Sequence, residues 1–141
     1  MIVILKSYFM EVSQSRTTQP STVRRTIKGD GKHTVSARTY GLVEFDKCGN
    51  YEYEIELGYT ITVKNGKMTQ LNDISFINPY IFPKDGKIDN ERFPSHCEDT
   101  HAGVTANYTV TGYIYLNTPA GVIALKSESK TNIFTLLTYL E

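Results

Sequence analysis

Residues 51–63 read YEYEIELGYTITV, and this stretch alternates apolar and polar side chains almost without a break. Successive side chains of a β-strand point to opposite faces of the sheet, so one face of this strand is apolar and the other is polar and faces solvent. The stretch therefore predicts an antiparallel β protein with an apolar interior. The apolar row consists of Tyr51, Tyr53, Ile55, Leu57, Tyr59, Ile61 and Val63.

The segment before this strand alternates in the same way. Residues 33–46 predict a second long strand, and Gly41 in its apolar row indicates a bulge or close packing against a large neighbour. A connection with an odd number of residues joins the two apolar rows on one face. The connection expected here sets Phe45 opposite Tyr51 and Gly41 opposite Ile55.

Asn65 and Gly66 form the strongest turn motif of the chain. Both residue types readily adopt the positive φ angles of a type I′ turn, whose twist matches that of the flanking strands. The motif predicts a hairpin whose return strand runs from Met68 to about Phe76. The alternation of this return strand is imperfect, and a bulge near residues 70–72 would restore it.

The rest of the chain predicts further strands around one irregular stretch. Residues 2–12 and 132–140 read as strands, and a turn after residue 117 would pair Leu116 with Ile123. Prolines and turn motifs interrupt residues 78–103, which predicts a long functional loop. We expect residues 1–141 to form a single antiparallel β-sandwich of about eight strands, with a small closed β-barrel as the alternative.

The charge balance argues against partners that bind through strong electrostatic attraction. The chain of 141 residues has 15 Lys and Arg against 15 Asp and Glu, so its formal net charge is zero. A neutral chain has no broad potential to attract nucleic acid, and no segment has the length of a membrane helix. We therefore expect a protein or carbohydrate surface as the partner, with homo-oligomer formation as a further option, and neither nucleic acid nor a membrane span.

Potential metal ligands are densest within the irregular stretch. Imidazole, thiolate and carboxylate groups are the usual ligands of zinc and related metals. The weak metal candidates are His96, Cys97 and His101, with Glu98 and Asp99 between them. A solvated polar loop is the competing interpretation, because the spacing matches no established zinc motif. The sequence shows no nucleophile elbow or phosphate loop, so it assigns no catalytic residue and no cofactor.

Two tyrosines and the two cysteines complete the set of candidate residues. Tyr113 and Tyr115 lie opposite the apolar row of their strand, and they predict a recognition surface for protein or sugar. The second layer of a barrel would show the same pattern. Cys48 and Cys97 lie in two different connections. A disulfide between them would close a loop of about fifty residues and stabilise the fold by roughly 3–4 kcal/mol, if the geometry allows it.

These observations favour a non-enzymatic β-sandwich that works by contact. It would be an extracytoplasmic accessory or adhesion-type domain, or a subunit of a larger assembly. The texture of residues 51–76 resembles that of small bacterial secreted β domains, but it holds no diagnostic motif and implies nothing further. We expect an extracytoplasmic or secreted location, although the chain shows no recognisable signal peptide. A small β-barrel carrier of an apolar ligand is one alternative. A loop-based metal-dependent enzyme is the other, and its residues would be His96, Cys97, Glu98, Asp99 and His101.

Overall fold

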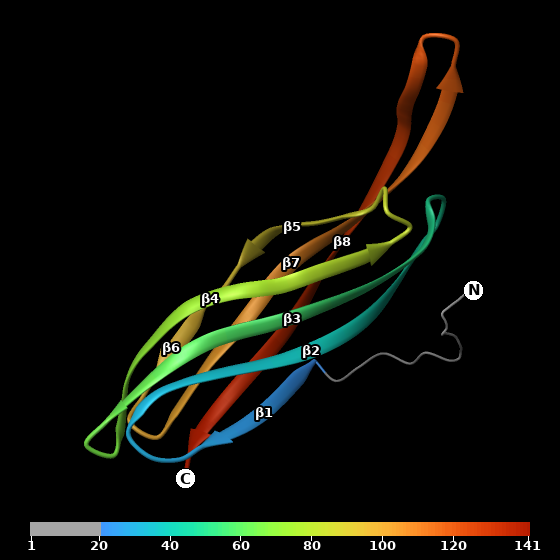
Figure 1. Cartoon of the computed structure of the whole chain (residues 1–141). Helices are drawn as coiled ribbons and strands as arrows, with labels where there is room; N and C mark the ends of the chain where they lie inside the picture. The colour runs from blue at the N-terminus through green and yellow to red at the C-terminus, as the bar shows by residue number, and fades with distance from the viewer. Residues whose placement is uncertain (1–20) are drawn as a thin grey trace.

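The computed structural model describes residues 21–141, and the strand expected at residues 2–12 lies outside them. Two β-sheets pack face to face as a sandwich (Figure 1). No helix in the described part of the chain is long and apolar enough to cross a membrane. The strands are β1 (Thr22–Ile27), β2 (Gly31–Phe45), β3 (Gly49–Lys64), β4 (Lys67–Phe82), β5 (Lys87–Arg92), β6 (Ser95–Cys97), β7 (His101–Thr118) and β8 (Gly121–Leu140).

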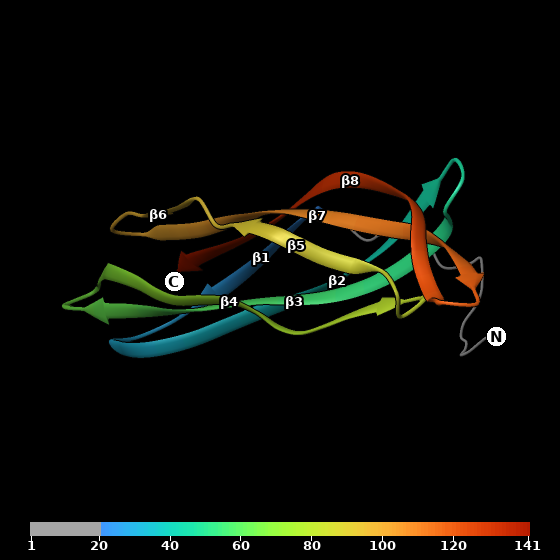
Figure 2. The same cartoon turned by 90° about the horizontal axis from the view of Figure 1, so that it is seen from above.

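The two sheets form separate layers, as the view from above shows (Figure 2). One sheet has the strand order β2-β3-β4, and the other has the order β1-β8-β7-β5 with β6 also paired to β7. All pairs are antiparallel except β1 with β8, which is parallel. Within residues 21–141 no strand of one sheet pairs with a strand of the other, so the predicted sandwich is confirmed and the closed barrel is wrong.

The turn between β2 and β3 is two residues shorter than the sequence predicted. Phe45 lies opposite Gly49, which sets Gly41 opposite Tyr53 rather than opposite Ile55. Gly49 has a φ of 85°, the left-handed conformation that ends a three-residue hairpin loop. The register therefore differs from the predicted one by two residues. An even shift leaves every side chain on its predicted face, so the apolar rows still meet in the core.

The hairpin between β3 and β4 has the predicted turn. Asn65 and Gly66 have φ values of 53° and 76°, both positive as a type I′ turn requires. The register shifts between Gly58 and Thr60 and once more before Val63, close to the predicted bulge. These irregularities let β4 follow the twist of β3 despite its broken alternation.

Residues 78–103, predicted as an irregular loop, are instead largely strand. They include the end of β4, all of β5 and β6, and the first residues of β7. Pro79 is tolerated because β4 is an edge strand and its register shifts there, where Asn78 has a φ of 47°. β5 and β6 are short and lack alternation of their own, and pairing with β7 holds them as strands.

The core lies between the two sheets and is filled by alternate residues of the long central strands. Every residue of the apolar row at 51–63 is at most 5% exposed, which confirms the pattern that predicted the fold. The largest fully buried side chains are Tyr51, Tyr59, Phe134, Ile55, Leu57, Ile61, Leu136, Val104, Val110 and Thr138.

Tyrosine hydroxyls buried in this core have hydrogen-bond partners. The hydroxyls of Tyr53 and Tyr108 lie 2.7 Å apart. The hydroxyl of Tyr59 donates to the carbonyl of Leu136 at 2.9 Å and lies 2.7 Å from the hydroxyl of Thr138. Burial raises the pKa of Tyr53, Tyr59 and Tyr108. The neutral phenols are therefore part of the folded state.

The buried phenols predict a loss of stability at alkaline pH. Their pKa values are higher in the folded than in the unfolded chain, so their contribution is complete below about pH 10 and is lost as the pH rises toward the folded values. We expect Tyr53, Tyr59 and Tyr108 to ionise only as the fold unfolds, which ultraviolet titration and near-ultraviolet circular dichroism would follow together.

The control for the alkaline transition is Tyr59→Phe. This variant has one fewer ionisable phenol in the core, so its free energy of unfolding should fall less steeply above about pH 10, by up to 1.4 kcal/mol per pH unit. Ionisation of every tyrosine in a chain that keeps its near-ultraviolet spectrum would contradict the prediction.

Candidate functional site

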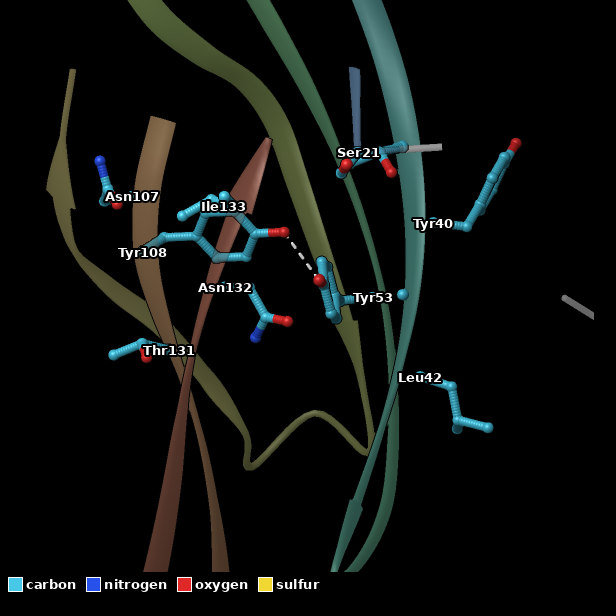
Figure 3. A pocket seen from close by; sticks show the side chains of 11 residues that line it. Ser21, Tyr40, Leu42, Tyr53, Asn107, Tyr108, Thr131, Asn132 and Ile133 are labelled. Atoms are coloured by element: carbon cyan, nitrogen blue, oxygen red, sulfur yellow. Dashed lines mark hydrogen bonds between the residues drawn. The ribbon is translucent and has the colours of Figure 1, made fainter. Parts of the chain in front are cut away.

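A pocket of about 390 Å³ opens to solvent between β2 and β8 (Figure 3). β1 pairs with β8 only from Thr135 onward, and the pocket lies where β8 continues beyond this pairing. The hydrogen-bonded hydroxyls of Tyr53 and Tyr108 meet at its inner wall. The amide nitrogen of Asn132 is buried there without a hydrogen-bond partner in the described chain. This open recess differs from the enclosed apolar interior that a ligand-carrying barrel requires.

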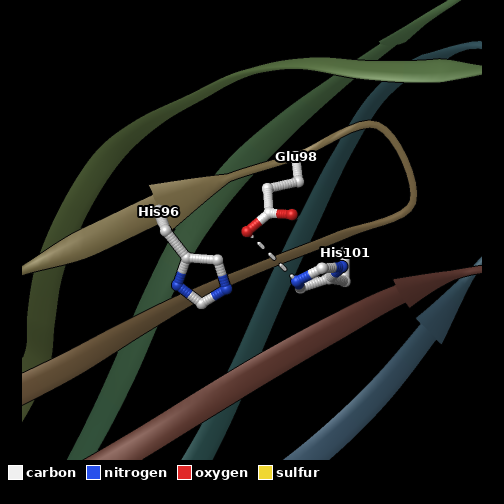
Figure 4. Close-up of side chains that lie close together, drawn as sticks. All are labelled: His96, Glu98 and His101. Carbon is white, nitrogen blue, oxygen red and sulfur yellow. Dashed lines mark ion pairs between the residues drawn. The ribbon is translucent and has the colours of Figure 1, made fainter.

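His96, Glu98 and His101 lie together where β6 ends and β7 begins (Figure 4). One ligand atom from each residue lies within 4.8 Å of the other two. His101 Nε2 is 3.4 Å from Glu98 Oε2, and the ring centroids of His96 and His101 are 5.4 Å apart. The structure therefore brings together two of the three predicted metal candidates with Glu98, which the sequence had named as part of the same cluster.

Cys97, the third predicted metal candidate, does not belong to this group. It lies between His96 and Glu98 in an extended segment, and alternate residues of such a segment share a face. Partial burial and the neighbouring Asp99 carboxylate raise the pKa of the Cys97 thiol. The neighbouring Asp99 carboxylate lies 3.8 Å from the Lys67 ammonium on β4.

The two cysteines are free. Cys48 lies in the turn between β2 and β3 and Cys97 ends β6, and these two elements are at opposite ends of the sandwich (Figure 1). Cys97 is opposite Ala102, which pairs with Thr138 on β8. The backbone N–H of Cys48 donates to the carboxylate of Glu128 at 2.6 Å. Thr138 and Glu128 are about ten residues and roughly 33 Å apart along β8. A disulfide needs Cα atoms within about 7 Å, so the predicted Cys48–Cys97 bond does not form in this fold.

The outer parts of β7 and β8 form a hairpin that extends beyond the body of the sandwich (Figure 1). Its pairs run from Tyr113 with Ser127 to Thr118 with Gly121, and we call residues 113–127 the hairpin tip. Neither strand of the tip pairs with a third strand among residues 21–141. Five of its large apolar side chains are 44–63% exposed: Tyr115, Leu116, Val122, Ile123 and Leu125.

Both faces of the hairpin tip carry exposed apolar side chains. Leu116 and Ile123 are directly opposite each other, as the sequence predicted, and share one face. Tyr115 and Val122 belong to the other face, because the direction of side chains alternates along each strand. The opposite sheet covers one face of each strand in the body of the sandwich, but the tip extends past it. A two-stranded ribbon alone cannot bury either face.

The predicted recognition residues, Tyr113 and Tyr115, lie where the hairpin tip leaves the body. Their ring centroids are 5.7 Å apart. The backbone N–H of Tyr113 donates to the Tyr51 hydroxyl at 3.1 Å, and this hydroxyl donates to the Asp85 carboxylate at 2.8 Å. These bonds connect the base of the tip to the core. The exposure of the four aliphatic residues beyond it was not predicted, although residues 113–125 contain no charged side chain.

Comparisons of the chain with protein-family models, with curated proteins and with solved structures found no match. The fold defines an all-β sandwich, and the described residues add three local features to it. These are the pocket beside β8, the His96–Glu98–His101 group and the apolar hairpin tip.

Proposed function

We propose that this protein is a non-enzymatic β-sandwich that works by contact, as a structural subunit that pairs with a second copy of itself. The hairpin tip is its contact element. The observation that carries this proposal is the exposure of five large apolar side chains on a ribbon that no second layer covers. Contiguous apolar surface of this kind is typical of interaction sites, whereas single exposed apolar residues are ordinary.

Burial of the tip would favour association. Full burial of a valine, leucine or isoleucine side chain contributes about 1.5–3 kcal/mol, and these residues are already about half buried. The outer edges of both strands also have no neighbouring strand in the described chain. Their backbone N–H and C=O groups are available to pair with another strand, as in recognition by strand addition.

Two features favour a second copy over a charged surface as the partner. A strand edge can pair with the same edge of another copy in an antiparallel, two-fold symmetric arrangement, which closes after two subunits. The formal net charge is zero, so two copies do not repel each other. The same neutrality gives no attraction to an anionic membrane.

Sedimentation velocity over a concentration series tests the proposal. We expect the wild-type chain to form dimers as its concentration rises, and the double variant Val122→Ser with Leu125→Ser to remain monomeric, because it loses two of the five exposed apolar side chains of the tip. The matched control is Tyr80→Ser on β4. Tyr80 is 53% exposed but lies outside the tip, so this variant should dimerise like the wild type.

Two outcomes would overturn the proposal. The first is a wild-type chain that stays monomeric at every concentration. The second is a tip double variant that dimerises with unchanged affinity while circular dichroism shows an intact fold. A monomeric wild type that pellets with neutral phosphatidylcholine vesicles would instead identify a lipid surface as the partner of the tip.

A further inference from the structure

We propose that His96, Glu98 and His101 bind a zinc ion at the turn between β6 and β7. This site does not depend on the proposed function, because it lies at the opposite end of the sandwich from the hairpin tip (Figure 1). The three side chains lie close together, their backbone is held by hydrogen bonds, and their donor atoms suit a transition metal.

The distances suit a single ion. Two donors that each lie about 2.0–2.1 Å from a tetrahedral zinc ion are roughly 3.3–3.4 Å from each other. His101 Nε2 and Glu98 Oε2 are already 3.4 Å apart. The donor atoms of all three residues lie within 4.8 Å of one another, so the ring of His96 needs to approach by little more than 1 Å. Rotation of side chains at the surface allows a movement of this size.

Backbone hydrogen bonds from three sides hold the turn that carries these ligands. The N–H of Glu98 donates to the carbonyl of His101 at 2.8 Å, which closes the turn between β6 and β7. The N–H of Met68 on β4 donates to the carbonyl of Asp99 at 2.9 Å. The N–H of Leu140 on β8 donates to the carbonyl of Thr100, also at 2.9 Å. The backbone that carries the ligands is therefore held in place before any ion binds, and only the side chains need to rotate.

Both imidazole rings also have a supporting neighbour. His96 is opposite Gly103, and its ring atom Cε1 lies 3.0 Å from the position that a β-carbon on Gly103 would take. The absence of a side chain at Gly103 gives the His96 ring room to lie across β7, toward His101. The ring of His101 stacks on that of Tyr139, its cross-strand partner on β8, with centroids 6.3 Å apart.

The donor set selects the class of ion. Two imidazoles and one carboxylate suit zinc and neighbouring transition metals, whereas calcium and magnesium need oxygen ligands. Three protein ligands leave a fourth position to water. An ion bound in this way joins β6 to β7 across their turn. Copper and nickel would compete with zinc for the same ligands, so zinc is the probe and magnesium is the negative control.

Isothermal titration of the full, untagged chain with zinc chloride tests the site. We expect saturable binding of one ion per chain, and no binding of magnesium chloride. His96→Ala and His101→Ala should each weaken zinc binding at least about tenfold, since each removes one of three ligands. His33→Ala removes the remaining histidine, whose ring contacts the Gly29 carbonyl, and should leave zinc binding unchanged.

Cys97→Ser distinguishes this site from the ligand set that the sequence suggested, and it too should bind zinc like the wild type. The proposal is overturned if the wild-type chain shows no saturable zinc binding, or if both histidine variants bind as tightly as the wild type. It is also overturned if Cys97→Ser abolishes binding, because the ligands would then include the thiol. Far-ultraviolet circular dichroism of each variant separates loss of a ligand from loss of the fold.

Discussion

Replacing Phe134 by alanine should lower the free energy of unfolding by about 3–5 kcal/mol. Phe134 is 1% exposed, lies on the central strand β8 and is opposite the small residue Ala106 on β7. The ring therefore fills space that its cross-strand neighbour leaves open. Its removal leaves a cavity between two sheets whose backbones are held by pairing and cannot collapse into it. A typical domain is stable by only about 5–15 kcal/mol, so the loss is large.

The matched control for Phe134 is its neighbour in the chain. Ile133 is 57% exposed and points to the opposite face of the same strand. Ile133→Ala should change the free energy of unfolding by no more than about 0.5 kcal/mol. Urea unfolding followed by tyrosine fluorescence measures both variants, because the chain has no tryptophan. Equal losses at the two positions would mean that β8 does not present its faces as described.

Side-chain alternation predicted the faces of the strands but not their register. A shift of two residues between β2 and β3 leaves every side chain on the same face, so the pattern at residues 51–63 fits both the expected and the observed pairing. The choice between them depends on Gly49, which adopts a positive φ and shortens the turn. The turn at Asn65 and Gly66 could be predicted, because an Asn-Gly motif specifies both the type and the length of a hairpin turn.

The strands in residues 78–103 could not be predicted because they owe their structure to a neighbour. β5 and β6 are short, and neither shows an apolar period of its own. They are strands because β7, a long strand, offers them its edge. The prolines that argued for a loop lie at an edge strand and in connections, where a missing N–H breaks no ladder within the sheet.

The same dependence explains which site residues were found. The clustering of potential metal ligands in the sequence located His96 and His101. Cys97 can be excluded from the ligand group only once residues 95–97 are known to form a strand, because successive side chains of a strand point to opposite faces. For the hairpin tip, the pairing of its strands could be predicted but the exposure of its side chains could not. The pairing of Leu116 with Ile123 follows from the turn after residue 117, yet no local pattern tells whether an opposite sheet reaches that far. Exposure of the tip is a property of the tertiary structure.

Substituting Gly41 by alanine should lower the free energy of unfolding by about 1–3 kcal/mol, although it adds one methyl group. A β-carbon at this position would overlap the ring of Tyr53, its cross-strand partner. The ring cannot move aside freely, because its hydroxyl is 2.7 Å from that of Tyr108 and the two rings meet edge to face with centroids 5.7 Å apart. The glycine that the sequence associated with a large neighbour is thus required by Tyr53.

A double-mutant cycle isolates this contact. Tyr53→Ala should destabilise the wild-type chain more than it destabilises the Gly41→Ala variant, because it removes the ring that the new methyl group overlaps. We expect a coupling of at least about 1 kcal/mol between the two positions in urea unfolding. Coupling of Gly41→Ala to Ile55→Ala instead would restore the register that the sequence first predicted. If the free-energy changes of Gly41→Ala and Tyr53→Ala are strictly additive, the Tyr53 ring does not restrict the side chain at residue 41. The loss of stability in Gly41→Ala would then have to arise in the backbone of β2.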